Sequence, residues 1–274
     1  MRESSWQAHI KGGLAYAQHL GGPKVALSMA EPSLFFRQIV VHAITSNTTS
    51  PATRQINGHY NYTDDDLTLI LDYETTQKQI PLELFIIMFH ITKLRALAAR
   101  GSNSRANLQH RMRNLFQQIN EFNSEAWAEA NCHHLGGLTA EIGHILQVAT
   151  RLYGLLVFPQ AATSGTITNA STLPAREVYD KLRIAQRANI LERIRKIWPN
   201  LLNPDQLCWA LIVTGVALAD GSAEDRDFIA QCLLDTWHNE LSGGTSFMIR
   251  EKLYAFWKLG KTGWEDCFNE PVPW

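Results

Sequence analysis

Several side chains of this 274-residue sequence have types and spacings that suit acid–base chemistry or metal binding. Glu141 and His144 form a Glu-x-x-His motif, which places both side chains on one face of a helix. Di-iron helical bundles combine two such motifs with two further glutamates, and this sequence lacks the second motif. We therefore interpret the motif as a capping or surface feature.

The segment Cys132-His133-His134 could supply metal ligands together with His144. Adjacent side chains on a helix point about 100° apart, so His133 and His134 cannot easily share one ion. The four cysteines stand singly and form no Cys-x-x-Cys pair, which argues against a zinc site. We expect neither a metal nor another cofactor.

Thr63 is followed by three consecutive aspartates, Asp64 to Asp66. Terpene synthases, which are also helical, hold magnesium between carboxylates four positions apart, but Thr68 and Leu69 occupy the later positions here. A capping threonine followed by acidic residues is the usual pattern of a helix N-terminus. The triplet therefore predicts the start of a helix.

The strongly apolar segment 82–99 carries three basic side chains, His90, Lys93 and Arg95. A helix that is apolar on all sides lies inside a bundle, so its polar groups either cap a core contact or point into a cavity. Cavities lined by apolar and aromatic groups are where proteins hold small ligands. We predict a pocket between this helix and the helix at 138–158, with Trp209 opposite.

The candidate site residues follow from this pocket. Histidine is the side chain best suited to transfer a proton near neutral pH. The candidate catalytic residues are therefore His90, His134 and His144. The candidate ligand-binding residues are aromatic groups on apolar helical faces, namely Phe85, Phe89, Trp127, Tyr153 and Trp209.

Apolar residues recur at helical spacing along almost the whole chain. The pattern predicts helices at 6–20, 34–44, from 64 onward, 82–99, 108–122, 126–134, 138–158, 176–198 and three times within 207–268. Polar stretches with Gly, Pro and Asn predict loops near 45–63 and 159–174. We therefore predict an all-α fold with about ten helices, forming a single domain over residues 1–274.

The composition narrows the classes of partner. The formal net charge of −1 provides no basic face for nucleic acid. No signal peptide is evident at the N-terminus, and no apolar run reaches the roughly 20 residues that span a bilayer. We therefore expect an intracellular protein, cytoplasmic or nuclear, that neither spans a membrane nor binds DNA directly.

The last quarter of the chain carries an ordered set of marks. An apolar segment at 209–218 ends at Asp220-Gly221-Ser222, and the charged helix start at 223–227 follows. A third segment ends in Phe256-Trp257, and Trp264 stands alone after it. This order resembles the C-terminal end of the regulatory domain, also called the fungal-specific transcription factor domain, of fungal zinc-cluster transcription factors.

The resemblance extends toward the N-terminus. The pattern Ser5-Trp6-x-x-His9-x-x-Gly12 is similar to a helix in the middle of that domain, and 149–153 is similar to another of its helices. The family's cysteine-rich zinc cluster and basic linker do not occur in this sequence. We therefore expect a shortened, stand-alone relative of the domain, which in this family responds to effectors and binds protein partners.

Three functions are compatible with these features. The leading hypothesis is a natural-product biosynthesis protein that binds an apolar small molecule and performs a cofactor-free cyclisation, such as a Diels–Alder (4+2) cycloaddition. The alternative is transcription regulation, as the effector- or partner-binding domain of a zinc-cluster transcription factor. The third is a structural module that forms a homodimer or binds a protein partner. No hydrolase, kinase or NAD-binding motif occurs.

Overall fold

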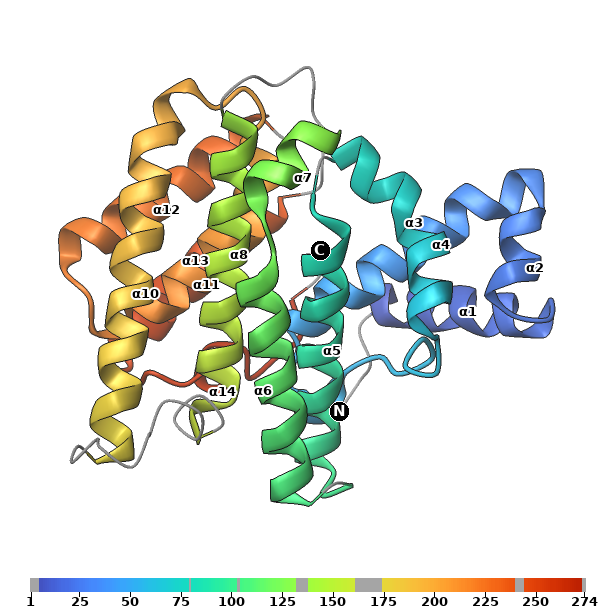
Figure 1. Cartoon of the computed structure of the whole chain (residues 1–274), viewed down its shortest axis with the longest axis horizontal. Helices are drawn as coiled ribbons and strands as arrows, with labels where there is room; N and C mark the ends of the chain where they lie inside the picture. The colour runs from blue at the N-terminus through green and yellow to red at the C-terminus, as the bar shows by residue number, and fades with distance from the viewer. Residues whose placement is uncertain are drawn as a thin grey trace.

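The computed structural model describes residues 5–78, 80–102, 104–131, 138–160, 174–239 and 244–272. These residues contain thirteen α-helices and no β-strand, which confirms the predicted single all-α domain. The N-terminal helices lie together at the right of Figure 1. They are α1 (Ser5–His19), α2 (Pro23–Ser28), α3 (Ala30–Thr48) and α4 (Asp64–Lys78).

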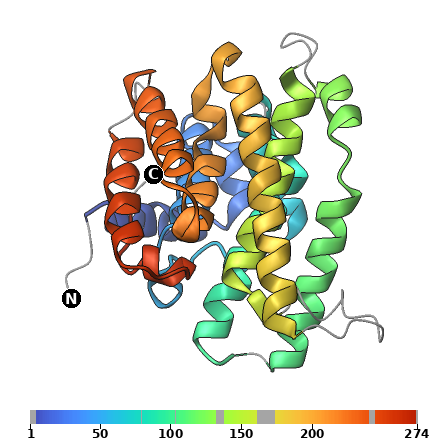
Figure 2. The ribbon, with the colours of Figure 1, turned by 90° about the vertical axis from the view of Figure 1, so that its left-hand side faces the viewer.

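Four long helices stand side by side in the order α5 (Leu82–Ala99), α6 (Arg105–Glu121), α8 (Leu138–Val157) and α10 (Ala175–Ile197), as Figure 1 shows. The short helix α7 (Ser124–Asn131) packs on α8. The C-terminal helices form a second layer (Figure 2). They are α11 (Cys208–Ala217), α12 (Ala223–Asn239), α13 (Thr245–Lys258) and α14 (Trp264–Cys267). Among the described residues, no helix has the length and apolar character needed to cross a membrane.

Helix α8 is the centre of the fold, because it packs against α5, α6, α7, α10 and α11. Its apolar residues recur at helical spacing, and Ile145, Ala149 and Leu152 are completely buried. Full burial of one such aliphatic side chain contributes about 1.5–3 kcal/mol of hydrophobic stabilisation. A helix surrounded by neighbours on several sides requires the broad apolar surface that its sequence provides.

Helix α4 begins where the sequence predicts. The hydroxyl of Thr63 accepts a hydrogen bond from the backbone N–H of Asp66 (3.1 Å), and the Asp66 carboxylate accepts one from the N–H of Thr63 (3.1 Å). This reciprocal pair satisfies two backbone donors that a helix N-terminus leaves without partners. The three aspartates therefore open a helix, with Asp64 as its first residue.

The predicted limits of the second helix and the following loop were wrong. The prediction ended the helix at 44, whereas α3 continues to Thr48 and the connection begins at 49. The hydroxyls of Thr45 and Thr48 donate to carbonyls of their own helix, at Val41 (2.9 Å) and Thr45 (2.6 Å). Polar residues that bond to the backbone in this way need no solvent. The other predicted loop, 159–174, lies almost entirely outside the described residues.

The end of α3 is fixed by a buried arginine of α5. Arg95 donates to the carbonyls of Thr48 (3.0 Å) and Ser50, and its Nε donates to the Glu265 carboxylate at 2.6 Å. Trp264 donates its indole N–H to the same Thr48 carbonyl at 2.8 Å. This cluster joins α3, α5 and α14. Arg95 is therefore a polar group that caps a core contact, one of the two roles predicted for basic residues on this helix.

Candidate functional site

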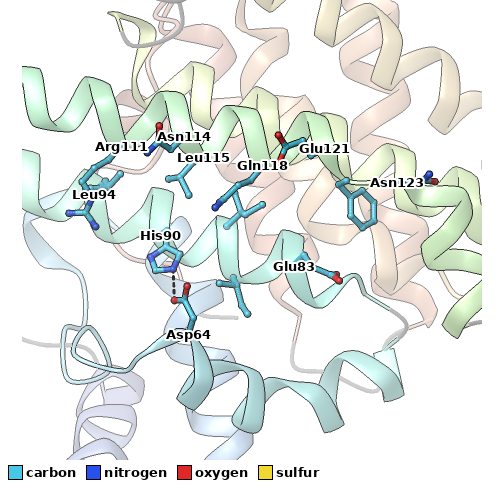
Figure 3. Close-up of a pocket in the computed structure, with 13 residues that line it drawn as sticks. Asp64, Glu83, His90, Leu94, Arg111, Asn114, Leu115, Gln118, Glu121 and Asn123 are labelled. Carbon is cyan, nitrogen blue, oxygen red and sulfur yellow. Dashed lines mark hydrogen bonds and ion pairs between the residues drawn. The ribbon is translucent and has the colours of Figure 1, made fainter.

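A groove of about 620 Å³ lies along α5 and α6, beside the start of α4; we call it the α5–α6 groove (Figure 3). Its residues recur every three or four positions on each helix, so each helix contributes one continuous face. Those from α5 are Glu83, Ile86, Ile87, His90 and Leu94, and those from α6 are Arg111, Asn114, Leu115, Gln118 and Glu121. Asp64, Phe122 and Asn123 complete the lining.

The floor and the rim of the groove differ in chemistry. Ile87, Leu94 and Leu115 are buried and form an apolar floor, whereas Asn114 and Gln118 are exposed on the rim. An apolar surface with a few polar groups at its edge is the usual composition of a small-molecule site. The α5–α6 groove is therefore our candidate site.

His90 and Asp64 form the most defined polar contact in the groove. The Nε2 atom of His90 lies 2.8 Å from Oδ1 of Asp64 (Figure 3). Burial lowers the pKa of His90 below its usual 6.5, and the positive charges of Lys93 and Arg111 lower it further. The hydrogen bond to Asp64 and the charge of Asp64 act in the opposite direction and raise this pKa. The imidazole is therefore mostly neutral at pH 7. Its Nε2–H donates to Asp64, which leaves Nδ1 as a proton acceptor.

The candidate catalytic residue His144 has partners outside this groove. Its Nε2 lies 2.8 Å from Ser124 Oγ and 2.8 Å from Glu125 Oε1. In a serine–histidine–acid catalytic group, the serine and the acid contact opposite ring nitrogens. Here Ser124 Oγ lies almost equally far from both ring nitrogens, 2.9 Å from Nδ1 and 2.8 Å from Nε2, so it is aligned with neither, and Ser124 is buried. The contacts of His144 therefore join α8 to α7.

Glu141, the other member of the Glu-x-x-His motif, pairs with α10. Its carboxylate lies 2.7 Å from Lys196 Nζ and 2.5 Å from Arg193 Nη1, and these two cations lower its pKa. The two residues of the motif therefore bind different neighbours. Among the described residues, no three His, Cys, Asp or Glu side chains are grouped so that they could hold a metal ion. His134 lies outside the described residues.

The candidate aromatic residues lie in the core or near it. Phe85, Phe89 and Tyr153 are buried, and the Tyr153 ring lies 5.7 Å from the Trp209 ring. The structure therefore packs Trp209 against α8. Neither these residues nor Trp127 lines the α5–α6 groove.

Trp127 is connected to the groove indirectly. Its ring centroid lies 6.4 Å from that of Phe122, which lines one end of the groove. It also packs over Gly143 of α8, where an added Cβ would come within 3.1 Å of the indole. Of the seven candidate residues that the structure describes, only His90 lines the groove itself.

The sequence did not reveal the contributions of α4 and α6 to the groove. Asp64 had already been explained as part of a helix start. Arg111, Gln118 and Glu121 belong to a polar helix face that has the same pattern as a solvated surface. One pattern in the sequence did point to this face: these polar residues alternate with Leu115 and Phe122 every three or four positions, so both kinds of side chain share one side of the helix.

A second, smaller groove of about 300 Å³ lies between α1, α2 and α3. Its described lining residues include Tyr16, Phe35 and Ile39, and all of them are uncharged. We call it the α1–α3 groove. Of its described lining residues, Tyr16 alone has a polar side-chain group, so the groove has few groups that could orient a ligand.

Comparison with known proteins identifies the family. The model of the fungal specific transcription factor domain matches residues 2–271, which is nearly the whole chain. The chain therefore belongs to the fungal specific transcription factor domain family. No curated protein and no solved structure gave a significant match.

Proposed function

We propose that this chain is an effector-binding domain in transcription regulation, and that a small molecule with an apolar body binds in the α5–α6 groove. The observation that carries the proposal is the groove itself, with its buried aliphatic floor and polar rim. Membership of the fungal specific transcription factor domain family supports a regulatory role.

The position of the groove suggests how a ligand would affect the rest of the domain. A molecule in the groove contacts α4, α5 and α6 together, because Asp64, His90 and Gln118 all line it. Helix α5 also carries Arg95, which fixes the end of α3 and binds Glu265. A ligand that binds only the folded arrangement stabilises it, by about 2.7 kcal/mol at a concentration one hundred times its Kd.

The test is native mass spectrometry of the protein after incubation with an extract of apolar fungal metabolites. Gln118→Trp places an indole in the groove, whereas Gln117→Trp is the matched control, since Gln117 is exposed and does not line the groove. We expect the wild type and Gln117→Trp to retain a small molecule that Gln118→Trp does not. Equal retention by all three proteins would exclude this groove as the site.

A second function is favoured by the His90–Asp64 pair. We propose as the alternative that the protein performs a cofactor-free cyclisation in natural-product biosynthesis, with an apolar substrate folded in the groove. A Diels–Alder cycloaddition forms two carbon–carbon bonds and releases nothing, so catalysis depends on orienting the substrate and excluding water. His90 would then polarise a carbonyl or move a proton, oriented by Asp64.

The same mass spectra separate the two functions. An enzyme converts the retained molecule over time into an isomer of equal mass, and His90→Gln slows that conversion while retention persists. An effector is retained unchanged. Homodimer or hetero-complex peaks without any small molecule would instead support the protein-partner function.

A further inference from the structure

The α5–α6 groove carries opposite charges at its two ends. Arg111 lies at one end beside Leu94, and Glu121 lies at the other end beside Asn123 (Figure 3). Glu83 of α5 also belongs to the acidic end. Arg111 and Glu121 are ten residues apart on α6, which corresponds to about 15 Å at the helical rise of ~1.5 Å per residue.

Arg111 is a cation that has no counterion among the residues that the structure describes. It is half-buried, and it forms no hydrogen bond or ion pair with any residue that the structure describes. Of the described lining residues, it is the one Lys or Arg. An arginine in this state is suited to bind an anion, and it binds a carboxylate with two parallel hydrogen bonds.

The charges around Arg111 favour an anion further. Burial lowers the pKa of Lys93, and the charge of Arg111 lowers it more, so the two cations lie within electrostatic reach. Lys93 donates to the Tyr60 carbonyl and has the opposing charge of Asp64 nearby. Asp64 is itself bonded to His90. A ligand carboxylate at Arg111 would therefore relieve repulsion between cations.

The acidic end has the reverse character. Glu83 is exposed and forms no ion pair with a residue that the structure describes, and Glu121 accepts a hydrogen bond from Gln117 at 2.8 Å. No described lysine or arginine lines this end. Between the ends, Ile87 and Leu115 form an apolar surface.

We propose that the α5–α6 groove binds an elongated molecule with a carboxylate at Arg111, an apolar body along Ile87 and Leu115, and an amine at Glu83 and Glu121. This inference rests on the proposed function and specifies the class and the orientation of its ligand. A molecule with only one charged end would leave the other end of the groove uncompensated.

The test is isothermal titration with three probes that share one apolar chain, used below their micelle-forming concentrations: ω-aminododecanoate, dodecanoate and dodecylamine. We expect ω-aminododecanoate to bind about tenfold or more tightly than either probe with one charged group. Arg111→Gln should weaken the two carboxylate probes and leave dodecylamine unchanged. Arg113→Gln is the matched control, because Arg113 is exposed and does not line the groove.

The acidic end is tested by the double variant Glu83→Gln with Glu121→Gln. It should weaken ω-aminododecanoate and dodecylamine, and leave dodecanoate unchanged. Equal affinities for the three probes, or binding that is insensitive to Arg111→Gln, would overturn the inference. If Gln118→Trp abolishes metabolite retention but ω-aminododecanoate does not bind, the proposed function stands and this ligand class is wrong. If Gln118→Trp has no effect on retention, the proposed function itself fails.

Discussion

Arg111 and His90 are close enough for the charge of one to affect the proton affinity of the other. Replacing Arg111 with Gln removes a positive charge that lowers the pKa of His90, so that pKa is expected to rise. Asp64→Asn should have the opposite effect, because the bond to Asp64 and its charge both raise the pKa. An NMR titration of the His90 ring checks both directions, with Arg113→Gln as the control. A pKa that stays constant in both variants would contradict the described geometry.

Arg95 shows what a basic residue does on the buried side of the same helix. Arg95→Met removes this donor from the buried carbonyls of Thr48 and Ser50, and it removes the ion-pair partner of Glu265. The Thr48 carbonyl keeps the Trp264 indole N–H, whereas the Ser50 carbonyl loses its donor. A buried acceptor left without a partner costs about 1–3 kcal/mol, so we expect a loss of about 1–3 kcal/mol in the free energy of unfolding. Urea denaturation measures it.

A milder change at the same cluster provides the comparison for Arg95→Met. Glu265→Gln keeps an oxygen acceptor at a side chain that is about half exposed, so its effect should be smaller. An Arg95→Met protein as stable as the wild type would show that the cluster contributes nothing to stability.

His90 and Arg95, which both lie on α5, also show how far the sequence could predict the site. Their positions on an apolar helix predicted that each would cap a core contact or face a cavity, and the structure shows one of each. The choice between these roles depends on which neighbours pack there. Those neighbours are Thr48 and Ser50 for Arg95, and they lie more than forty positions away in the sequence. Local spacing contains no information about such partners.

At the scale of elements, the start of α4 is the clearest local feature. Thr63→Ala removes the hydroxyl that accepts the Asp66 N–H, and loss of such a cap costs about 1 kcal/mol. Thr68→Ala is the matched control, because Thr68 is exposed within α4 and alanine has the better helix propensity. Thermal unfolding should therefore show a lower Tm for Thr63→Ala and no decrease for Thr68→Ala. Equal effects of the two substitutions would argue against the cap.

Element limits were predicted well where local chemistry decides them. The start of α4 follows from a cap within four residues, and the sequence predicted it correctly. The end of α3 depends on Arg95, Trp264 and other distant donors that bury its polar residues. Because those donors come from α5 and α14, a polar segment that resembled a loop continues as a buried helix instead.

The basic residues of helix α10 also have distant partners that the local sequence does not show. Five of its basic residues, Arg183, Arg187, Arg193, Arg195 and Lys196, have a sequence spacing that is typical of a solvated helix face. Arg183 is instead buried and binds the Asp220 carboxylate with both terminal nitrogens, at 2.8 and 2.5 Å. Four further basic residues of α10 each lie within 2.7 Å of a carboxylate: Arg187 with Asp220, Arg193 and Lys196 with Glu141, and Arg195 with Asp225.

At the scale of the whole molecule, one buried histidine makes stability depend on pH. His59 is fully buried, and neither ring nitrogen forms a hydrogen bond with a residue that the structure describes. Burial, reinforced by the charge of Lys93, lowers its pKa from 6.5 to about 3. Since the folded pKa is below the unfolded one, the unfolded chain binds more protons between these values. Stability should therefore be complete above pH 6.5 and decrease as the pH falls toward 3. His90, with its lowered pKa, contributes in the same direction.

Urea denaturation at a series of pH values measures this dependence. His59→Phe keeps an aromatic ring beside Tyr60 and Phe89 and removes the titrating group, so its stability should depend less on pH in this range. The paired carboxylate of Asp220, whose pKa is lowered from 3.8 to about 2, acts separately at lower pH. An unchanged slope in His59→Phe would assign the pH dependence to other groups.

The central claim is that a small molecule binds in the α5–α6 groove, and hydrogen exchange of the whole protein with and without its retained molecule tests it most directly. We predict slower exchange at the start of α4 and along α5 and α6, the three elements that line this groove. The α1–α3 groove, although it is apolar, should show no change. Protection confined to α1, α2 and α3, with none at α5 and α6, would contradict the claim.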